Sequence, residues 1–295
     1  MIRAWQTMDH LLQYRRQPYA TPSVRLHGES QARLPNGHDR TPTMTFMELS
    51  TIAIAGFLSA IIKNGVGIGS GIFLLPVLSL VFPAKIALGI GAPIMLGSDI
   101  IGLRNYWKEW ASTRELLWLL VPAVPGLLLG TWLLPIIPGH AFRMGVGIFG
   151  MTYAMGMLFP RSHIVTAFTR LLPRPRPGIE RYSAVFYGML GGIATVMCHA
   201  GGLVWSLHLL STQKNRRVFV GTIVLSFAIT NLYKTFAYVK IGILDTQTLL
   251  TAILSLPAIY IGALAGNILN KRANHQIFRM SVLVAIFSVS LLLIL

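Results

Sequence analysis

The chain has 295 residues, of which 54% are hydrophobic and only 12% are charged, and its mean hydropathy is +0.62. Because soluble proteins carry about 25% charged residues, this composition excludes a conventional water-facing shell and a disordered chain. The 25 Lys and Arg residues against nine acids give a net charge of +16. These cations lie in the tail and between apolar runs, where they suit lipid headgroups and not nucleic acid. The composition predicts an all-α polytopic membrane protein.

The first segment, residues 1–45, is polar and is predicted to be a disordered tail. It is rich in Arg, Pro and Gly and has no apolar run long enough for a signal-peptide core. Met44 and Met47 stand directly before the first apolar run, so a second interpretation is that translation begins there. Under either interpretation, residues 1–43 are expected to be dispensable for membrane insertion.

From residue 46 onward, apolar runs alternate with short polar breaks in two groups. The first membrane repeat, 46–159, contains runs at 49–62, 72–82, 86–107, 115–136 and 141–159. After a basic connecting loop at 160–182, the second repeat, 183–295, contains runs at 183–197, 203–212, 218–238, 247–269 and 275–295. A helix needs about 20 apolar residues to span a bilayer, and the first two runs of each group fall short. Each half is therefore predicted to contain a short Gly-broken helix pair followed by three long helices.

The two groups resemble each other, which predicts an internal duplication. At one offset of 132 residues, Asp99 matches Asn231 and Pro125 matches Pro257. Internal repeats are typical of secondary transporters. If each short pair forms one broken span, each half crosses the membrane four times. If both short helices cross, each half crosses five times and the repeats are inverted; the sequence leaves both topologies open.

The break between the first two runs is the glycine-rich stretch 65–71, and the second half has an equivalent stretch at 198–202. Glycine at every second position suits unwound backbone better than helix packing, which favours a spacing of four, although close packing is the alternative explanation. Unwound backbone exposes N–H groups at the positive end of the next helix, where an anion binds well. Paired broken segments mark the substrate site of a transporter. The expected substrate-binding residues are Lys63, Asn64, Gly67, Gly69, Ser70, Gly71, His199, Gly201 and Gly202.

These motifs resemble the sulfite exporter TauE/SafE family of membrane transporters. The resemblance covers about residues 49–295 and rests on Gly-x-Gly-x-Gly at 67–71 followed by Pro76, on the second pair of glycines at 201–202, and on the two-part layout. It implies transport of sulfite, sulfonates and related small sulfur-containing anions. Ser70 replaces a glycine that is usual in the first motif, and His199-Ala200 replaces part of the second, which leaves the exact substrate open.

Asp99 and Lys234 are charged residues inside apolar runs, where a charge is costly and therefore indicates a functional role. Asp99 lies within the third run, and Lys234 lies one helical turn beyond Asn231, the repeat equivalent of Asp99. A structural ion pair between the two halves is one interpretation, and a proton-coupling or substrate role is the other. His208 is a weaker candidate than His199 for a site role.

Residue types that enzymes need are scarce in the apolar runs. Asp99 is the one carboxylate well inside a run, Cys198 is the one cysteine of the chain, and no zinc-ligand spacing occurs. We expect no enzyme activity, no metal and no cofactor. The predicted function is secondary transport of a small anion in the bacterial inner membrane, with the lipid bilayer as surroundings and a proton or ion as possible coupling partner. An anion channel and a non-transporting membrane interaction or assembly protein are the alternatives.

Overall fold

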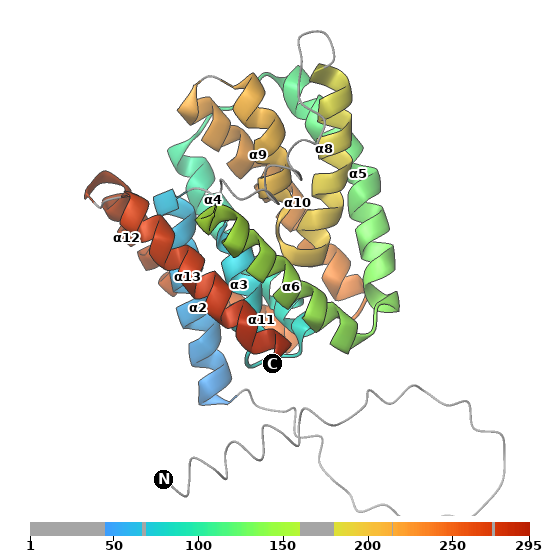
Figure 1. Cartoon of the computed structure of the whole chain (residues 1–295), viewed down its shortest axis with the longest axis vertical. Coiled ribbons are helices and arrows are strands. Elements are labelled where there is room, and N and C mark those ends of the chain that lie inside the picture. Colours follow the sequence, from blue (N-terminus) through green and yellow to red (C-terminus); the bar gives the residue numbers. More distant parts are fainter. Residues whose placement is uncertain (1–44, 67–68, 160–179, 214, 273–274) are drawn as a thin grey trace, which may run out of the picture. The chain divides into compact units, whose positions relative to one another are not determined.

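The computed structural model describes residues 45–66, 69–159, 180–213, 215–272 and 275–295. In these ranges every regular element is a helix (Figure 1), which confirms the predicted all-α class. The predicted tail, except for Thr45, and most of the predicted basic connecting loop lie outside the described residues.

The helices follow the two groups of apolar runs. In the first group they are α2 (Phe46–Val66), α3 (Ser70–Leu78), α4 (Ala84–Asn105), α5 (Thr113–Ile136) and α6 (Gly139–Leu158). In the second group they are α8 (Glu180–Cys198), α9 (Gly201–Thr212), α10 (Arg216–Lys240), α11 (Thr246–Leu254), α12 (Leu256–Arg272) and α13 (His275–Ile294).

Four of the described helices, α2, α4, α5 and α10, are long and apolar enough to cross a membrane, and the bent pair α11 and α12 makes a fifth candidate span. The outer surface is equally apolar. Along α5 an exposed stripe with helical spacing consists of Leu117, Val121, Val124, Leu128 and Trp132. A stripe of this kind requires lipid around it, and the protein is a multi-pass membrane protein.

The first helix of each group is longer than the sequence predicted. The run at 49–62 becomes a helix of 21 residues, because a capping box starts it early and two polar residues continue it. The Glu48 carboxylate accepts from the Thr45 N–H at 2.8 Å, and the Thr45 hydroxyl accepts from the Glu48 N–H at 3.3 Å. At the other end Lys63 and Asn64 stay helical. Each break therefore follows a long helix, and only the helix after it is short.

The fourth run of the second group, predicted as one helix at 247–269, is divided. α11 and α12 meet at Ser255 with a bend of 42°. Pro257 has no N–H for the helical ladder, and its ring would clash with the carbonyl of Ile253 in a straight helix. The Ser255 hydroxyl donates to the carbonyl of Ala252 at 2.6 Å and so satisfies one acceptor at the bend.

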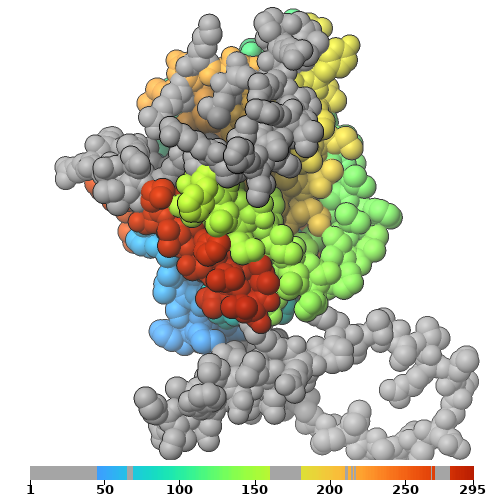
Figure 2. All heavy atoms as spheres, in the orientation of Figure 1, coloured from blue at the N-terminus to red at the C-terminus, as the bar shows by residue number. Residues whose placement is uncertain are grey.

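Helices from different groups pack against each other in a reciprocal pattern. α5 packs on α8 and α12 packs on α2, while α4 pairs with α10 and α6 with α13; α6 and α13 lie side by side on the face shown in Figure 2. Glycines permit the two reciprocal contacts. A Cβ on Gly126 of α5 would lie 2.1 Å from the Met189 carbonyl oxygen, and one on Gly262 of α12 would lie 2.4 Å from that of Phe57. Equivalent halves would pack in this way, and the duplication itself stays a prediction.

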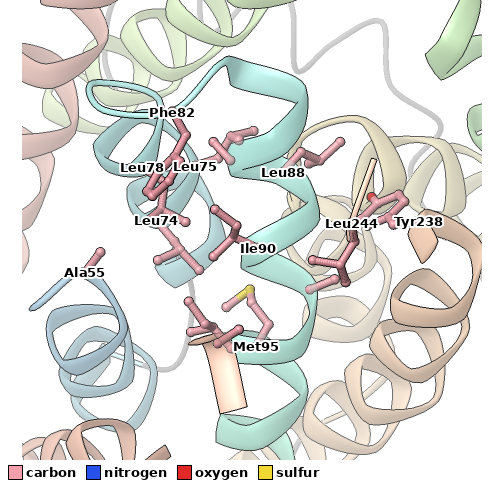
Figure 3. Close-up of a cluster of buried hydrophobic side chains, with 14 of the residues drawn as sticks. Ala55, Leu74, Leu75, Leu78, Phe82, Leu88, Ile90, Met95, Tyr238 and Leu244 are labelled. Atoms are coloured by element: carbon pink, nitrogen blue, oxygen red, sulfur yellow. The ribbon is translucent and has the colours of Figure 1, made fainter. Parts of the chain in front are cut away.

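The short helix α3 is enclosed by protein. Leu74, Leu75 and Leu78 join Leu88 and Ile90 of α4 in one buried cluster, part of which is drawn in Figure 3. A helix that is apolar on all sides is stable only when neighbours surround it. The cluster therefore anchors α3 inside the bundle, and this fixes its N-terminus beside the second break.

Candidate functional site

The two breaks meet at one buried cavity. The first break and the start of α3 contribute Gly69, Ser70, Gly71 and Ile72, and the second break with the start of α9 contributes His199, Ala200, Gly202 and Leu203. α4 and α10 complete the wall with Met95, Ile223 and Phe227. The cavity has a volume of about 10 Å³, which is the room that one water molecule needs. The described form is thus nearly closed around the site.

Two helices, α3 and α9, begin at this cavity with their backbone N–H groups. Gly69 precedes α3 with φ 96°, and Ala200 precedes α9 with φ −99°, and neither helix has a side-chain cap at this end. The first helical bond of α3 runs from the Phe73 N–H to the Gly69 carbonyl, so the N–H groups of Ser70, Gly71 and Ile72 come before the ladder begins. Uncapped N–H groups at the positive end of a helix dipole attract anions.

His199 occupies the second break and is 3% exposed. Its backbone is left-handed, with φ 54°, a region that few residues other than glycine adopt. Two glycines make room for it. A Cβ on Gly71 would lie 2.5 Å from the His199 carbonyl oxygen, and one on Gly91 would lie 2.5 Å from its Nε2. The imidazole is therefore held in one place against the cavity.

The partners of His199 assign its tautomer. Nε2 lies 3.1 Å from the carbonyl oxygen of Leu88, which can only accept, so Nε2 carries the proton and donates. Nδ1 lies 2.7 Å from Nζ of Lys234 and accepts from it. The Lys234 ammonium also donates to the carbonyl oxygen and the hydroxyl of Thr195, at 3.1 and 3.2 Å. All three of its protons thus have an acceptor, and none of the three acceptors is a carboxylate.

A second buried group surrounds Asp99. The Asp99 carboxylate forms an ion pair with Lys63 of α2 and accepts from the amide of Asn231 of α10 at 2.6 Å. Both charged side chains are almost fully buried, at 6% and 0% exposure. The Lys63 ammonium also lies 5.4 Å from the ring centroid of Phe227, which lines the cavity. This contact places the ion pair directly behind the cavity wall.

One interpretation of the sequence was a direct ion pair between Asp99 and Lys234, and the structure shows a different pairing. Asp99 has Lys63 as its cation, and Lys234 instead bonds to His199 and Thr195. The physical reason is that the longer α2 carries Lys63 into the bundle. The sequence predicted a run that ends at residue 62 and placed Lys63 among the substrate-binding residues.

The other predicted site residues divide into two sets. Gly69, Ser70, Gly71, His199 and Gly202 line the cavity. Asn64 and Gly201 face other helices: Cβ of Asn64 lies against Gly266 of α12, and Gly201 lies against Thr195 and Gly191 of α8. His208 bonds to Ser183 at 3.1 Å, away from the cavity. Gly67 lies outside the described residues.

Several residues of the site were missed from the sequence. Thr195 was detectable, because the offset of 132 residues between the two predicted repeats relates it to Lys63. Met95, Ile223 and Phe227 carried no such signal, since an apolar residue in an apolar helix looks the same whether it faces a cavity, a neighbour or lipid.

A multi-pass helical bundle with two broken segments that face one buried cavity has the architecture of a secondary transporter. The family comparison agrees with this architecture. The model of the sulfite exporter TauE/SafE family matches residues 52–293, so the chain belongs to this family of membrane transporters, which are not enzymes, and the predicted resemblance is confirmed. No curated protein and no solved structure matches the chain.

Proposed function

We propose that the protein is a secondary transporter of small, sulfur-containing anions such as sulfite or organosulfonates, and that the substrate binds in the cavity between the two breaks. The observation that carries the proposal is the convergence of two uncapped helix N-termini on this cavity. The proposed place of action is the bacterial inner membrane.

The chemistry of the wall fits such a substrate. A sulfite or sulfonate group presents three oxygens that accept hydrogen bonds, and backbone N–H groups at a helix start are suitable donors. The hydroxyl of Ser70, which lines the cavity, adds one more donor. The apolar wall of Met95, Ile223 and Phe227 would contact the carbon part of an organosulfonate. Because the cavity holds no more than about one water, substrate entry requires the two halves to move apart, as in alternating access.

Binding is tested first, with one hydroxyl removed. Ser70→Ala should weaken the binding of methanesulfonate to the purified protein about tenfold, since a hydrogen bond to a charged group contributes about 1.5–3 kcal/mol. Ser79→Ala is the matched control, because the Ser79 hydroxyl is buried near the other end of α3 and donates to the Leu75 carbonyl at 2.7 Å. Equal affinities of the two variants would contradict the proposed site.

Transport is tested by counterflow in proteoliposomes. If the protein is a carrier, vesicles preloaded with unlabelled methanesulfonate should take up the labelled anion faster than empty vesicles do. The reason is that the binding site returns to the outer face with unlabelled anion bound. A channel would give uptake without this trans-stimulation. A non-transporting interaction protein would give neither uptake nor binding.

A further inference from the structure

Two buried lysines stand behind the cavity, each separated from it by one ring. Lys234 donates to Nδ1 of His199, and the Lys63 ammonium faces the ring of Phe227. His199 and Phe227 both line the cavity. The lysines would therefore act on an anion in the cavity through their electric field, without direct contact.

The charges in this region do not balance. Among the described residues, the buried side chains that carry a formal charge are Lys63, Asp99 and Lys234. Lys63 and Asp99 neutralise each other as an ion pair. Lys234 has three neutral acceptors, since His199 is neutral in the tautomer that its partners assign.

The remaining titratable groups near Lys234 do not change this sum. The Tyr238 hydroxyl donates to the Val196 carbonyl at 2.7 Å, and the Cys198 thiol donates to the Ala194 carbonyl at 3.3 Å. Both groups therefore keep their protons and are neutral. The three acceptors around Nζ fit Lys234 as an ammonium, and among the described residues this positive charge has no counter-charge.

We propose that this single unbalanced charge makes the cavity selective for monoanions over dianions and neutral molecules. The inference rests on the proposed anion site and specifies which anions it takes. In a water-poor interior an uncompensated charge is costly. A monoanion brings the sum of buried charges to zero, whereas a dianion leaves one negative charge and a neutral molecule leaves the positive one. Lys63, Asp99 and Lys234 are thus positioning residues that set the charge of the substrate.

Two probes of similar shape and fixed charge test the selectivity. Methanesulfonate is a monoanion and sulfate a dianion across neutral pH, and they differ by a methyl group in place of one oxygen. Equilibrium binding of each radiolabelled probe is measured on the full chain in nanodiscs of uncharged lipid. We expect methanesulfonate to bind at least about tenfold more tightly than sulfate.

Three variants test the count of buried charge in different ways. Asp99→Asn raises it by one and should move the preference toward sulfate. Lys234→Met lowers it by one and should abolish the binding of both anions. The double variant Lys63→Met/Asp99→Asn leaves the count unchanged and should keep the preference for methanesulfonate, even though it removes the ion pair. If Asp99→Asn does not fold, the other two variants still test the count.

Lys240→Met is the matched control for Lys234→Met, because Lys240 lies on the same helix and is exposed. It should bind both probes as the unmodified protein does. If neither probe binds the unmodified protein, the proposed function fails. If both probes bind the unmodified protein, two results would overturn this inference. In the first, Lys240→Met is the only variant that keeps a preference between the probes. In the second, Asp99→Asn and the double variant behave alike, so that the charge count does not set the selectivity.

Discussion

Asp99 and Asn231 stand at equivalent positions of the two predicted repeats, and they are hydrogen-bonded to each other at 2.6 Å. In a duplicated chain, a residue and its equivalent touch only where the axis that relates the two halves passes between them. α4 and α10, which carry these residues, also pack together. The same offset relates Lys63 to Thr195, and each contacts the neighbouring helix of its own half, one as the donor to Asp99 and the other as an acceptor from Lys234. Equivalent positions of the two predicted halves thus make similar contacts through different chemical groups.

The Lys63–Asp99 pair leads to the first prediction. Lys63→Met and Asp99→Asn should each destabilise the folded protein by about 3–5 kcal/mol, because each leaves the other group buried and without its counter-charge. The double variant should recover most of the loss. The check is a double-mutant cycle by thermal unfolding in detergent, with the Asp99→Asn and Lys234→Met pair as the comparison cycle. A larger coupling energy in the comparison cycle would contradict the pairing found.

Much of this site could be predicted from the sequence, and the misses have physical causes. The run lengths and the glycine breaks indicated the helices and five residues of the cavity wall. The partner of Asp99 was missed because run length alone treats Lys63 as an end of a helix, whereas an ion pair lets a helix carry a lysine into the bundle. The bend at Ser255 was missed because proline does not always break a helix: α5 contains Pro122, Pro125 and Pro135 and stays continuous. Whether a proline bends a helix depends on the packing around it.

The second prediction concerns the space around His199. Gly91→Ala should displace the imidazole, since the new Cβ would lie 2.5 Å from Nε2. Loss of the hydrogen bond that His199 donates to Leu88 and of the one that it accepts from Lys234 should then reduce anion binding and transport about tenfold or more. Binding of methanesulfonate and counterflow measure the effect.

Gly97→Ala, on the same helix, is the matched control for Gly91→Ala. Its Cβ would meet only the end of the Leu256 side chain, which is partly exposed and can rotate away. It should leave anion binding unchanged. A similar loss of anion binding in both variants would mean that α4 tolerates no added methyl group. It would also mean that the position of His199 is not the cause of the loss.

The third prediction concerns pH. Glu109 lies in the loop after α4, and its carboxylate accepts from Arg217 of α10, with Nη2 to Oε1 at 2.9 Å. This hydrogen bond holds the pKa of Glu109 below its ordinary value. A carboxyl group with a lowered pKa stabilises the folded state fully above its unfolded pKa, about 4.3, and the effect is lost as the pH falls through the folded pKa.

The measurement is the melting temperature of Glu109→Gln against the unmodified protein between about pH 3 and pH 7. The unmodified protein should be slightly more stable at neutral pH, with a difference that shrinks below about pH 4. Arg217→Gln should remove the same pH dependence, and high salt should reduce it, because the pair is exposed. A difference that grows on acidification would have the wrong sign and would exclude this pair as its source.

The last prediction separates backbone strain from site geometry, using two glycines with left-handed backbone. Gly69 has φ 96° at the start of α3, and Gly242 has φ 73° in the turn after α10. Alanine at either position should cost about 1–2 kcal/mol, because a Cβ is disfavoured in this region. Among the described residues neither Cβ has a severe clash: at Gly69 the nearest atom is Oη of Tyr153 at 3.4 Å, and at Gly242 nothing lies within 4 Å. Both variants should therefore fold with similarly lowered melting temperatures. Only Gly69→Ala should also shift the N–H groups of α3 at the cavity and weaken methanesulfonate binding, by about tenfold. Parallel losses of binding in both variants would attribute the effect to stability alone and would remove the start of α3 from the site.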